Sequence, residues 1–195
     1  MEQPKIGVYI CECGVNIAAT VNVPGVVAFA KRLPNVTVAR QYKYMCSEPG
    51  QNMIKDDIRE LGLDRVVVAS CTPRMHEITF QTAVAEAGLN PYYFAMSNIR
   101  EQCSWIIKDM GQATAKAKRL VSSTVARVAY QEALEARVEP VTKAALIVGA
   151  GIAGIQAALT MADAGYPVYL VEREPSIGGH MAQLDKTFPT LDCST

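Results

Sequence analysis

Three glycines stand in the spacing Gly-x-Gly-x-x-Gly, at Gly149, Gly151 and Gly154, directly after an apolar run. A stretch with helical spacing follows, and then a second apolar run that ends in Glu172. In a strand-helix-strand unit, such glycines permit a tight turn, close approach to a pyrophosphate, and close packing of helix on sheet. Glu172 lies 18 residues after Gly154, near the usual place of a ribose-binding carboxylate. The pattern predicts a dinucleotide site; the alternative is a glycine-rich turn in an ordinary βαβ unit.

A second glycine pair favours FAD over NAD as the dinucleotide. Gly178 and Gly179 come six residues after Glu172, where many flavoproteins return the chain to the pyrophosphate. The acid at 172 disfavours a cofactor with a 2′-phosphate, although Arg173 follows it directly and joins the candidate cofactor-binding residues. The alternative interpretation of the glycine pair is a simple mobile turn.

The charge balance excludes some partners. The chain has 19 basic and 19 acidic residues with no long run of either sign, which argues against nucleic acid. No apolar run approaches the roughly 20 residues of a membrane span, and the N-terminus does not resemble a signal peptide. We therefore expect a cytoplasmic protein, in which the six cysteines act as ligands or thiols rather than disulfides.

Strand-like and helix-like segments alternate in the first part of the chain. Apolar runs suited to buried strands lie at 5–11, 36–42, 65–70 and 91–96. Helical spacing is found at 23–33, 47–61 and 75–87, and from Asn98 to about Ala136 with a break near Gly111. Because such alternation produces parallel sheets, we predict an α/β fold. It has a four-stranded parallel sheet with flanking helices, followed by the first βαβ of a Rossmann-like FAD-binding domain.

Three parts are expected along the chain. Residues 1–136 form a cysteine-rich α/β domain, 137–143 break the helical pattern and form a linker, and 144–195 begin the FAD-binding domain. About 50 residues are fewer than a dinucleotide-binding domain normally needs. We therefore expect the second domain to be truncated.

Five cysteines follow the predicted strands. Cys11 and Cys13 end the first strand, Cys46 follows the second, Cys71 the third, and Cys103 lies in the helical region after the fourth. The carboxyl ends of parallel strands share one edge of a sheet, where open α/β folds bind ligands. A thiolate-rich site suits an iron–sulfur cluster or zinc. We predict that these five thiols surround a metal site, with four of them holding a cubane cluster and a fifth spare or switchable.

Other interpretations of these residues stay open. Free cysteines are often small buried hydrophobes, and Cys11 with Cys13 could act as a redox dithiol. Arg74 and His76 could donate hydrogen bonds to cluster sulfurs or lie on the surface of a helix start. Trp105 is expected to be a packing residue.

Several segments together resemble the A-type subunit of heterodisulfide reductase. They are ICECGVNIA at 10–18, YMCSEPGQ at 44–51, VVVASCTPRMHE at 66–77, GLNPYYFAMSNIREQCSW at 88–105, and the flavin-type unit from 144. The resemblance implies a cytoplasmic iron–sulfur flavoprotein with FAD and several [4Fe–4S] clusters. It further implies flavin-based electron bifurcation coupled to reduction of the CoM–S–S–CoB heterodisulfide in methanogenesis.

The resemblance also assigns residues and partners. It implies that four of the five cysteines hold an N-terminal cluster, and that the glycines at 149, 151, 154, 178 and 179 with Glu172 hold the FAD pyrophosphate and ribose. The partners would be other subunits of the complex, with a homodimer left open. The family chain is longer, and its ferredoxin-type cysteine segments are missing here. The rival hypothesis is a non-enzymatic cluster-binding or docking module that binds no flavin; a zinc-bound regulatory domain is a third.

Overall fold

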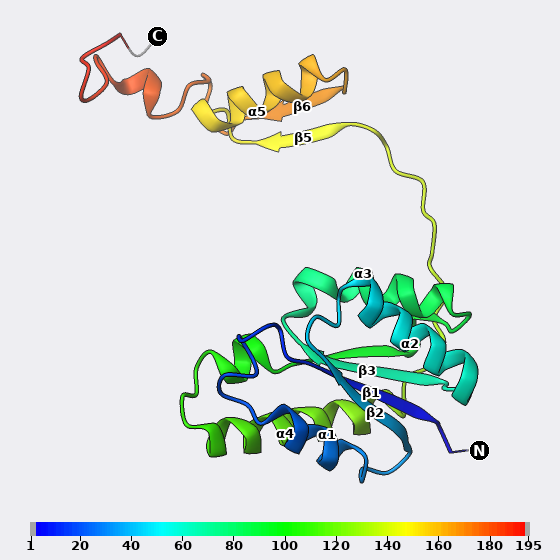
Figure 1. Cartoon of the computed structure of the whole chain (residues 1–195). Coiled ribbons are helices and arrows are strands. Elements are labelled where there is room, and N and C mark those ends of the chain that lie inside the picture. The colour runs from blue at the N-terminus through cyan, green and yellow to red at the C-terminus, as the bar shows by residue number, and fades with distance from the viewer. Residues whose placement is uncertain (1–2, 194–195) are drawn as a thin grey trace. The chain divides into compact units, whose positions relative to one another are not determined.

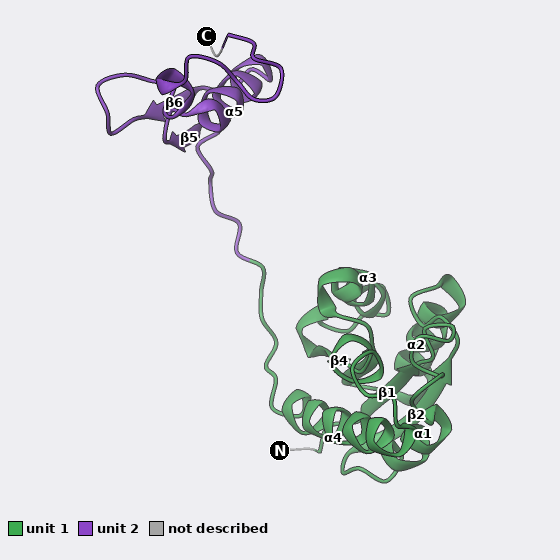
Figure 2. Ribbon diagram, turned by 90° about the vertical axis from the view of Figure 1, so that its left-hand side faces the viewer, with its two compact units in different colours: residues 1–136 green, residues 137–195 purple. Residues whose placement is uncertain are grey.

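The structure is a computed structural model that describes residues 3–193. The chain divides into two compact units, the first ending at Ala136 and the second beginning at Arg137 (Figure 2). None of the helices in the described range combines the length and the apolarity that a bilayer crossing requires.

Four parallel strands form the sheet of the first unit, in the order β2-β1-β3-β4. The strands are β1 (Ile6–Cys11), β2 (Val36–Tyr42), β3 (Arg65–Ser70) and β4 (Phe94–Asn98). The helices are α1 (Val23–Ala30), α2 (Glu48–Leu61), α3 (Pro73–Glu86) and α4 (Met110–Val128). Helices α1 and α4 cover one face of the sheet, and α2 and α3 cover the other (Figure 1). The predicted α/β class is confirmed.

The two-residue period of the strands sorts their side chains between two core layers. In β1, Ile6, Val8 and Ile10 pack in the layer under α1 and α4, whereas Tyr9 and Cys11 pack in the layer under α2 and α3. Successive side chains of a strand point to opposite faces, so a strand that is buried on both sides is apolar throughout. The face on which Cys11 lies is therefore fixed by its position in the strand.

The structure differs from the prediction in the segment after the third helix. The fourth strand begins at Phe94 rather than 91, because Asn90 caps a short 3₁₀ turn by accepting a hydrogen bond from the Tyr92 N–H. The region expected as one long helix from Asn98 contains a π-helical turn, Arg100–Ser104, and then α4.

Helix α4 begins at the break predicted near Gly111, but its end differs from the prediction. Asp109 caps its first turn by accepting from the Gln112 N–H. The helix ends at Val128 rather than near 136. At this end, Arg65 donates to the Val128 and Gln131 carbonyls. Those carbonyls lie beyond the regular hydrogen bonding of the helix, and the guanidinium satisfies them.

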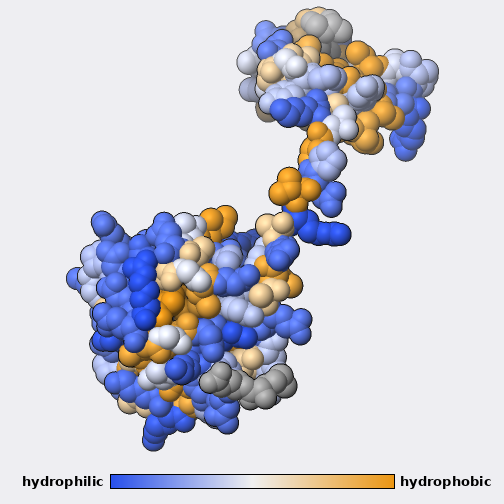
Figure 3. Space-filling model, turned by 90° about the vertical axis from the view of Figure 1, so that its right-hand side faces the viewer, coloured by the Kyte–Doolittle hydropathy of each residue, from blue (hydrophilic) through white to orange (hydrophobic). Residues whose placement is uncertain are grey.

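The second unit is a single strand-helix-strand repeat. Strands β5 (Ala145–Val148) and β6 (Val168–Val171) pair in parallel, and α5 (Ile152–Asp163) connects them. Apolar side chains of both strands are exposed, and Figure 3 shows hydrophobic residues gathered on the surface of this smaller body. A two-stranded sheet buries little surface, so within the described residues this unit lacks the core that the first unit has.

A buried carboxylate joins three elements of the first unit. Asp57 of α2 accepts a hydrogen bond of 3.0 Å from the Tyr9 hydroxyl of β1. It also accepts two of 2.7 Å each from the Arg40 guanidinium of β2. Burial, together with the neighbouring carboxylate, raises the pKa of Tyr9 above its usual value, so the phenol stays a neutral donor. The group holds α2 against the strands that end in the cysteine loops.

We predict that Asp57→Ala lowers the free energy of unfolding by about 2 kcal/mol, because it leaves the buried Tyr9 hydroxyl without an acceptor. Arg40 is half-exposed, so its ion pair adds little to this figure. Asp56→Ala, the exposed neighbour on the same helix, should change the unfolding free energy by less than about 0.5 kcal/mol. Urea titrations of the two variants test this; equal midpoints would contradict it.

Candidate functional site

Four of the predicted thiols line one small pocket at the carboxyl edge of the sheet. This thiol pocket is lined by Cys11, Cys13, Tyr44, Cys46, Ser70, Cys71, His76, Phe80 and Arg100. The chain continues from β1 to β2 on one side and then returns to β3 on the other side of β1. The crevice between β1 and β3 is the topological switch point at which open α/β sheets bind ligands.

Backbone N–H groups converge on the sulfur of Cys11. The N–H of Cys13 donates to Cys11 Sγ at 3.3 Å, and the N–H of Met45 donates to it at 3.4 Å. Cys13 has a left-handed backbone (φ 50°), which few residues other than glycine adopt. A non-glycine residue held in this conformation is typical of functional sites. The strained turn therefore places two thiols and one N–H donor at the same pocket.

Burial dominates the acid–base state of two pocket thiols, Cys11 and Cys71. It raises the pKa of the Cys11 thiol to about 11, although the two N–H donors act in the opposite direction. Burial likewise raises the pKa of Cys71, and the nearby Arg100 charge opposes it. Both sulfurs are protonated at neutral pH when no metal is bound, so a metal that binds there must displace protons.

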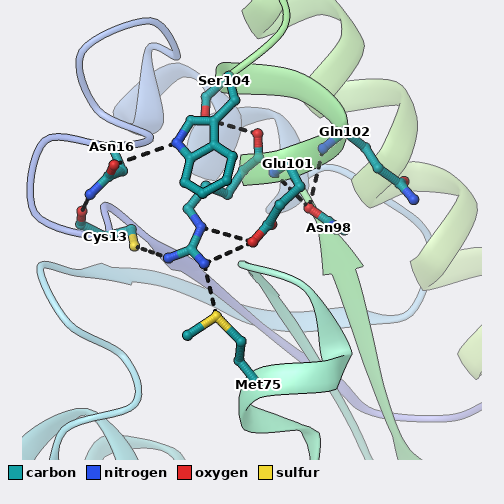
Figure 4. Close-up of polar contacts among 9 residues, drawn as sticks. Cys13, Asn16, Met75, Asn98, Glu101, Gln102 and Ser104 are labelled. Carbon is teal, nitrogen blue, oxygen red and sulfur yellow. Dashed lines mark hydrogen bonds and ion pairs between the residues drawn. The ribbon is translucent and has the colours of Figure 1, made fainter. Parts of the chain in front are cut away.

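Arg100 is a lining residue of this pocket, and its hydrogen-bond partners Cys13, Met75 and Glu101 are labelled in Figure 4. Its Nη1 donates to Cys13 Sγ at 3.1 Å, and its Nε and Nη2 donate to the Glu101 carboxylate at 3.0 and 2.7 Å. Nη2 also donates to Met75 Sδ at 3.0 Å. The guanidinium carbon lies 4.9 Å from the centre of the Trp105 ring. Trp105, expected as a packing residue, is half-exposed and covers the arginine.

Cys46 is positioned by the start of α2. Gln51 donates a hydrogen bond of 2.7 Å to the Cys46 carbonyl, and Gly50 packs so closely on the Met45 carbonyl that a Cβ at position 50 would overlap it. The same Met45 residue supplies an N–H to Cys11. The loop after β2 is therefore held by contacts that require a glycine.

The structure does not bring Cys103 to the thiol pocket. Cys103 is fully buried in the core layer under α1 and α4, and its thiol donates to the Ala113 carbonyl at 3.1 Å. The π-helical turn after β4 places it on the opposite face of the sheet from Cys11 and Cys71. The two predicted donors to cluster sulfurs lie in different surroundings. His76 lines the thiol pocket, whereas Arg74 is exposed.

Within residues 3–193, no three His, Cys, Asp or Glu side chains are arranged to hold a single metal ion. The four pocket thiols thus line a common space without converging on one point. A cubane cluster offers a separate iron corner to each of four thiolates, so its ligands surround it rather than meet. The donor set, four sulfurs with N–H groups directed at them, suits such a cluster.

The glycine turn of the second unit forms an open cradle at the carboxyl end of β5. Gly149 has a left-handed backbone (φ 98°), and a Cβ on Gly154 would overlap the Gly149 carbonyl. A Cβ on Gly151, in contrast, would meet nothing in the described structure. The space beside Gly151 at the start of α5 is where a pyrophosphate would approach the helix N-terminus.

The second glycine pair returns to this turn, as the sequence predicts. Gly178 forms a β-bridge with Gly151, and its N–H donates to the Ala150 carbonyl at 2.7 Å. The N–H groups of Glu174 and Ala150 donate to the Glu172 carboxylate and hold its pKa below the usual range, so the carboxylate is ionised. Arg173 is exposed and pairs with Glu174. Gly179 packs against Gly151.

The sequence interpretation missed Arg100 and the Met45 N–H group. Arg100 stands three residues before Cys103 in an apparently ordinary helix start. Its position at the pocket depends on the π-helical turn, which no sequence pattern indicated. Backbone donors such as Met45 leave no trace in residue type, although the glycine at position 50 hints at a close backbone contact.

The chain is similar to known proteins in both of its units. The family model described as FAD dependent oxidoreductase matches residues 145–188, which confirms the predicted Rossmann-like FAD-binding start in the second unit. The chain is also similar over nearly its whole length to curated archaeal reductase subunits. It is 60% identical over 194 residues to the second iron–sulfur A-type subunit of CoB–CoM heterodisulfide reductase of Methanopyrus kandleri, covering 99% of this chain and 30% of that protein.

Two further relatives carry names of the same subunit type. The chain is 59% identical to a protein of Archaeoglobus profundus that is named as similar to the A-type heterodisulfide reductase subunit, covering 99% of this chain and 28% of that protein. It is 57% identical to the A-type subunit of the H₂:CoB–CoM heterodisulfide, ferredoxin reductase of Methanothermobacter marburgensis, covering 100% and 30%. The predicted resemblance to this subunit type is confirmed, and the chain is homologous to part of that oxidoreductase component. It spans about 30% of the length of these relatives.

We predict that Gly50→Ala lowers the free energy of unfolding by about 1–3 kcal/mol, because its new methyl group displaces the Met45 carbonyl. Gly111→Ala, also in the first turn of a helix, meets only the Asp109 side chain and should change the value by less than about 1 kcal/mol. Chemical denaturation monitored by circular dichroism gives both numbers. Similar small effects at the two positions would show that the loop after β2 is not held as described.

Proposed function

We propose that the first unit holds one [4Fe–4S] cluster on Cys11, Cys13, Cys46 and Cys71, and that the chain acts in electron transfer with FAD in the second unit. The observation that carries this proposal is the meeting of four thiols from three strand ends in one pocket at a switch point. Thiolates are soft ligands and favour iron–sulfur clusters among the groups that fit such a site.

The surroundings of the thiols support a cluster in particular. The N–H groups of Cys13 and Met45 and the guanidinium of Arg100 all donate to ligand sulfurs. Hydrogen bonds of this kind stabilise the negative charge of cluster thiolates and tune the reduction potential. Cys103 lies outside the pocket, which makes it the spare member of the predicted five.

The second unit would hold the FAD pyrophosphate at Gly149, Gly151 and Gly154, and the ribose at Glu172. When bound, FAD supplies exchange of two electrons and the cluster supplies exchange of one. The chain's own groups position these carriers: the open face of Gly151 admits the phosphates, and the N–H groups around Glu172 keep that carboxylate ionised for the ribose hydroxyls. Arg173 is a candidate for contact with the same cofactor.

For the whole protein we propose the role that the relatives' names describe, as one component of a heterodisulfide reductase-type complex. Flavin-based electron bifurcation with a cluster relay, cytoplasmic location, and association with the other subunits belong to this proposal. A homodimer stays a prediction. The support is the identity of 57–60% with the three relatives named above.

We expect the chain, reconstituted without oxygen, to bind about four iron and four sulfide ions. Cys11→Ala, Cys13→Ala, Cys46→Ala and Cys71→Ala should each lose most of this iron, because a cubane needs four thiolates. Cys103→Ala is the matched control and should keep it. Iron and acid-labile sulfide assays give the answer.

Zinc and flavin assays of the same preparation discriminate the rival functions. Zinc without sulfide would favour the regulatory zinc domain, and neither metal nor flavin would favour the docking module. A Cys103→Ala variant that loses its iron, beside a Cys11→Ala variant that keeps it, would overturn the proposed ligand set.

A second prediction concerns FAD. Because the second unit is expected to be truncated, we expect the chain to bind FAD weakly, so the test measures the binding of added FAD. Gly151→Ala should weaken this binding at least tenfold while leaving the far-UV circular dichroism unchanged, because its methyl group meets no protein atom but occupies the phosphate approach. Gly154→Ala should weaken FAD binding and also change the circular dichroism, since it displaces the Gly149 turn. Isothermal titration with FAD measures the affinity, and wild-type affinity in Gly151→Ala would remove this assignment.

A further inference from the structure

Arg100 is held in one orientation by contacts from different parts of the first unit. Glu101, its neighbour in the π-helical turn, binds Nε and Nη2, and Met75 of α3 accepts from Nη2. The indole of Trp105 covers the guanidinium. Only 12% of the arginine side chain is exposed. A long side chain with this many partners and so little exposure has lost its usual rotamer freedom.

The guanidinium nitrogen that does not bind Glu101 donates to a sulfur. A guanidinium has five N–H bonds. The contacts with Glu101 and Met75 use the one on Nε and both on Nη2, and the contact with Cys13 uses one on Nη1. The remaining N–H is on Nη1, the same nitrogen that lies 3.1 Å from Cys13 Sγ. Nη1, the nitrogen that binds neither Glu101 nor Met75, therefore lies at a sulfur of the thiol pocket, of which Arg100 is a lining residue.

We propose that Arg100 is a positioning residue that holds a fixed positive charge at the Cys13 sulfur and thereby raises the reduction potential of the bound cluster. This inference rests on the proposed function, in which Cys13 is a cluster ligand. It assigns the control of the electron affinity of this cluster to one side chain outside the ligand set.

The sign follows from the charge of the two redox states. Reduction adds one electron, so a nearby cation stabilises the reduced cluster more than the oxidised one. Glu101 opposes this effect, but its carboxylate binds the far side of the guanidinium and leaves Nη1 nearest to the sulfur. The pair acts as a dipole whose positive end faces the pocket. Because Arg100 is mostly buried, water and salt screen it weakly.

The Arg100–Glu101 pair also explains why both residues tolerate burial. The second carboxylate oxygen of Glu101, Oε2, is buried and has no partner among the described residues. An ion in such a position is costly unless an opposite charge is close. The turn thus keeps the two charges together, and keeps the positive one fixed beside Cys13.

The test is a redox titration of the anaerobically reconstituted 195-residue chain, monitored by the EPR signal of the reduced cluster. Arg100→Gln removes the charge and keeps some hydrogen-bonding capacity. We compare the two proteins at the ambient potential where the wild-type cluster is half reduced. There we expect the ratio of reduced to oxidised cluster in Arg100→Gln to be at least tenfold lower than in the wild type. This corresponds to a midpoint about 59 mV lower for one electron. Arg100→Lys keeps the charge but lacks the planar guanidinium, so its midpoint potential should lie between those of the wild type and Arg100→Gln.

Arg74→Gln is the matched control, because it removes an exposed arginine at the start of α3 and should shift the ratio less than about threefold. An Arg100→Gln midpoint within the shift of this control overturns the inference and leaves the proposed function intact. If Arg100→Gln retains too little iron to titrate, Glu101→Gln decides: it removes the opposing negative charge, so a raised midpoint supports the inference, and an unchanged or lowered midpoint overturns it. A wild-type chain that takes up no iron and sulfide refutes the proposed function itself.

Discussion

The placement of β1 between β2 and β3 is the constraint on which the rest of the first unit depends. Parallel strands require crossover helices, and a chain that leaves β1 first to one side and then to the other opens a crevice at their carboxyl ends. The loops after these strands must then meet at that crevice. Each of them carries cysteine, so the connectivity of the sheet, and not any local motif, gathers the thiols.

The pocket combines groups that act in opposite directions on the thiols of Cys11 and Cys71. Burial favours neutral sulfur, whereas the N–H donors and the Arg100 cation favour the thiolate. In the absence of metal the burial effect prevails. A cluster held as proposed would require thiolates, and the donors that already point at Cys11 and Cys13 would then face charged ligands.

Apolar runs in the sequence predict the α/β class, and the positions of cysteines after strands predict that four of the five thiols lie at one edge of the sheet. The strand after 65 and the glycine turn after 148 were recognised by the same reasoning, and the structure agrees with it. Cys103 shows where this reasoning ends. Its side of the sheet depends on a π-helical turn, which has no sequence period of its own, and a helical pattern cannot distinguish that turn from α-helix.

Arg100 was missed for a related reason. Its contacts join residues distant in the chain, such as Cys13 and Met75, and they exist only after the strands are paired. The end of α4 depends likewise on Arg65, which reaches it from β3. Residue type and spacing predict elements, whereas tertiary hydrogen bonds decide where some of those elements stop.

The left-handed backbone of Cys13 has a consequence for engineering. A residue with a Cβ pays roughly 1 kcal/mol for this conformation, whereas glycine adopts it freely. Selection for heat resistance alone should therefore favour glycine at position 13. Selection for electron transfer should favour cysteine, because only cysteine supplies the thiol.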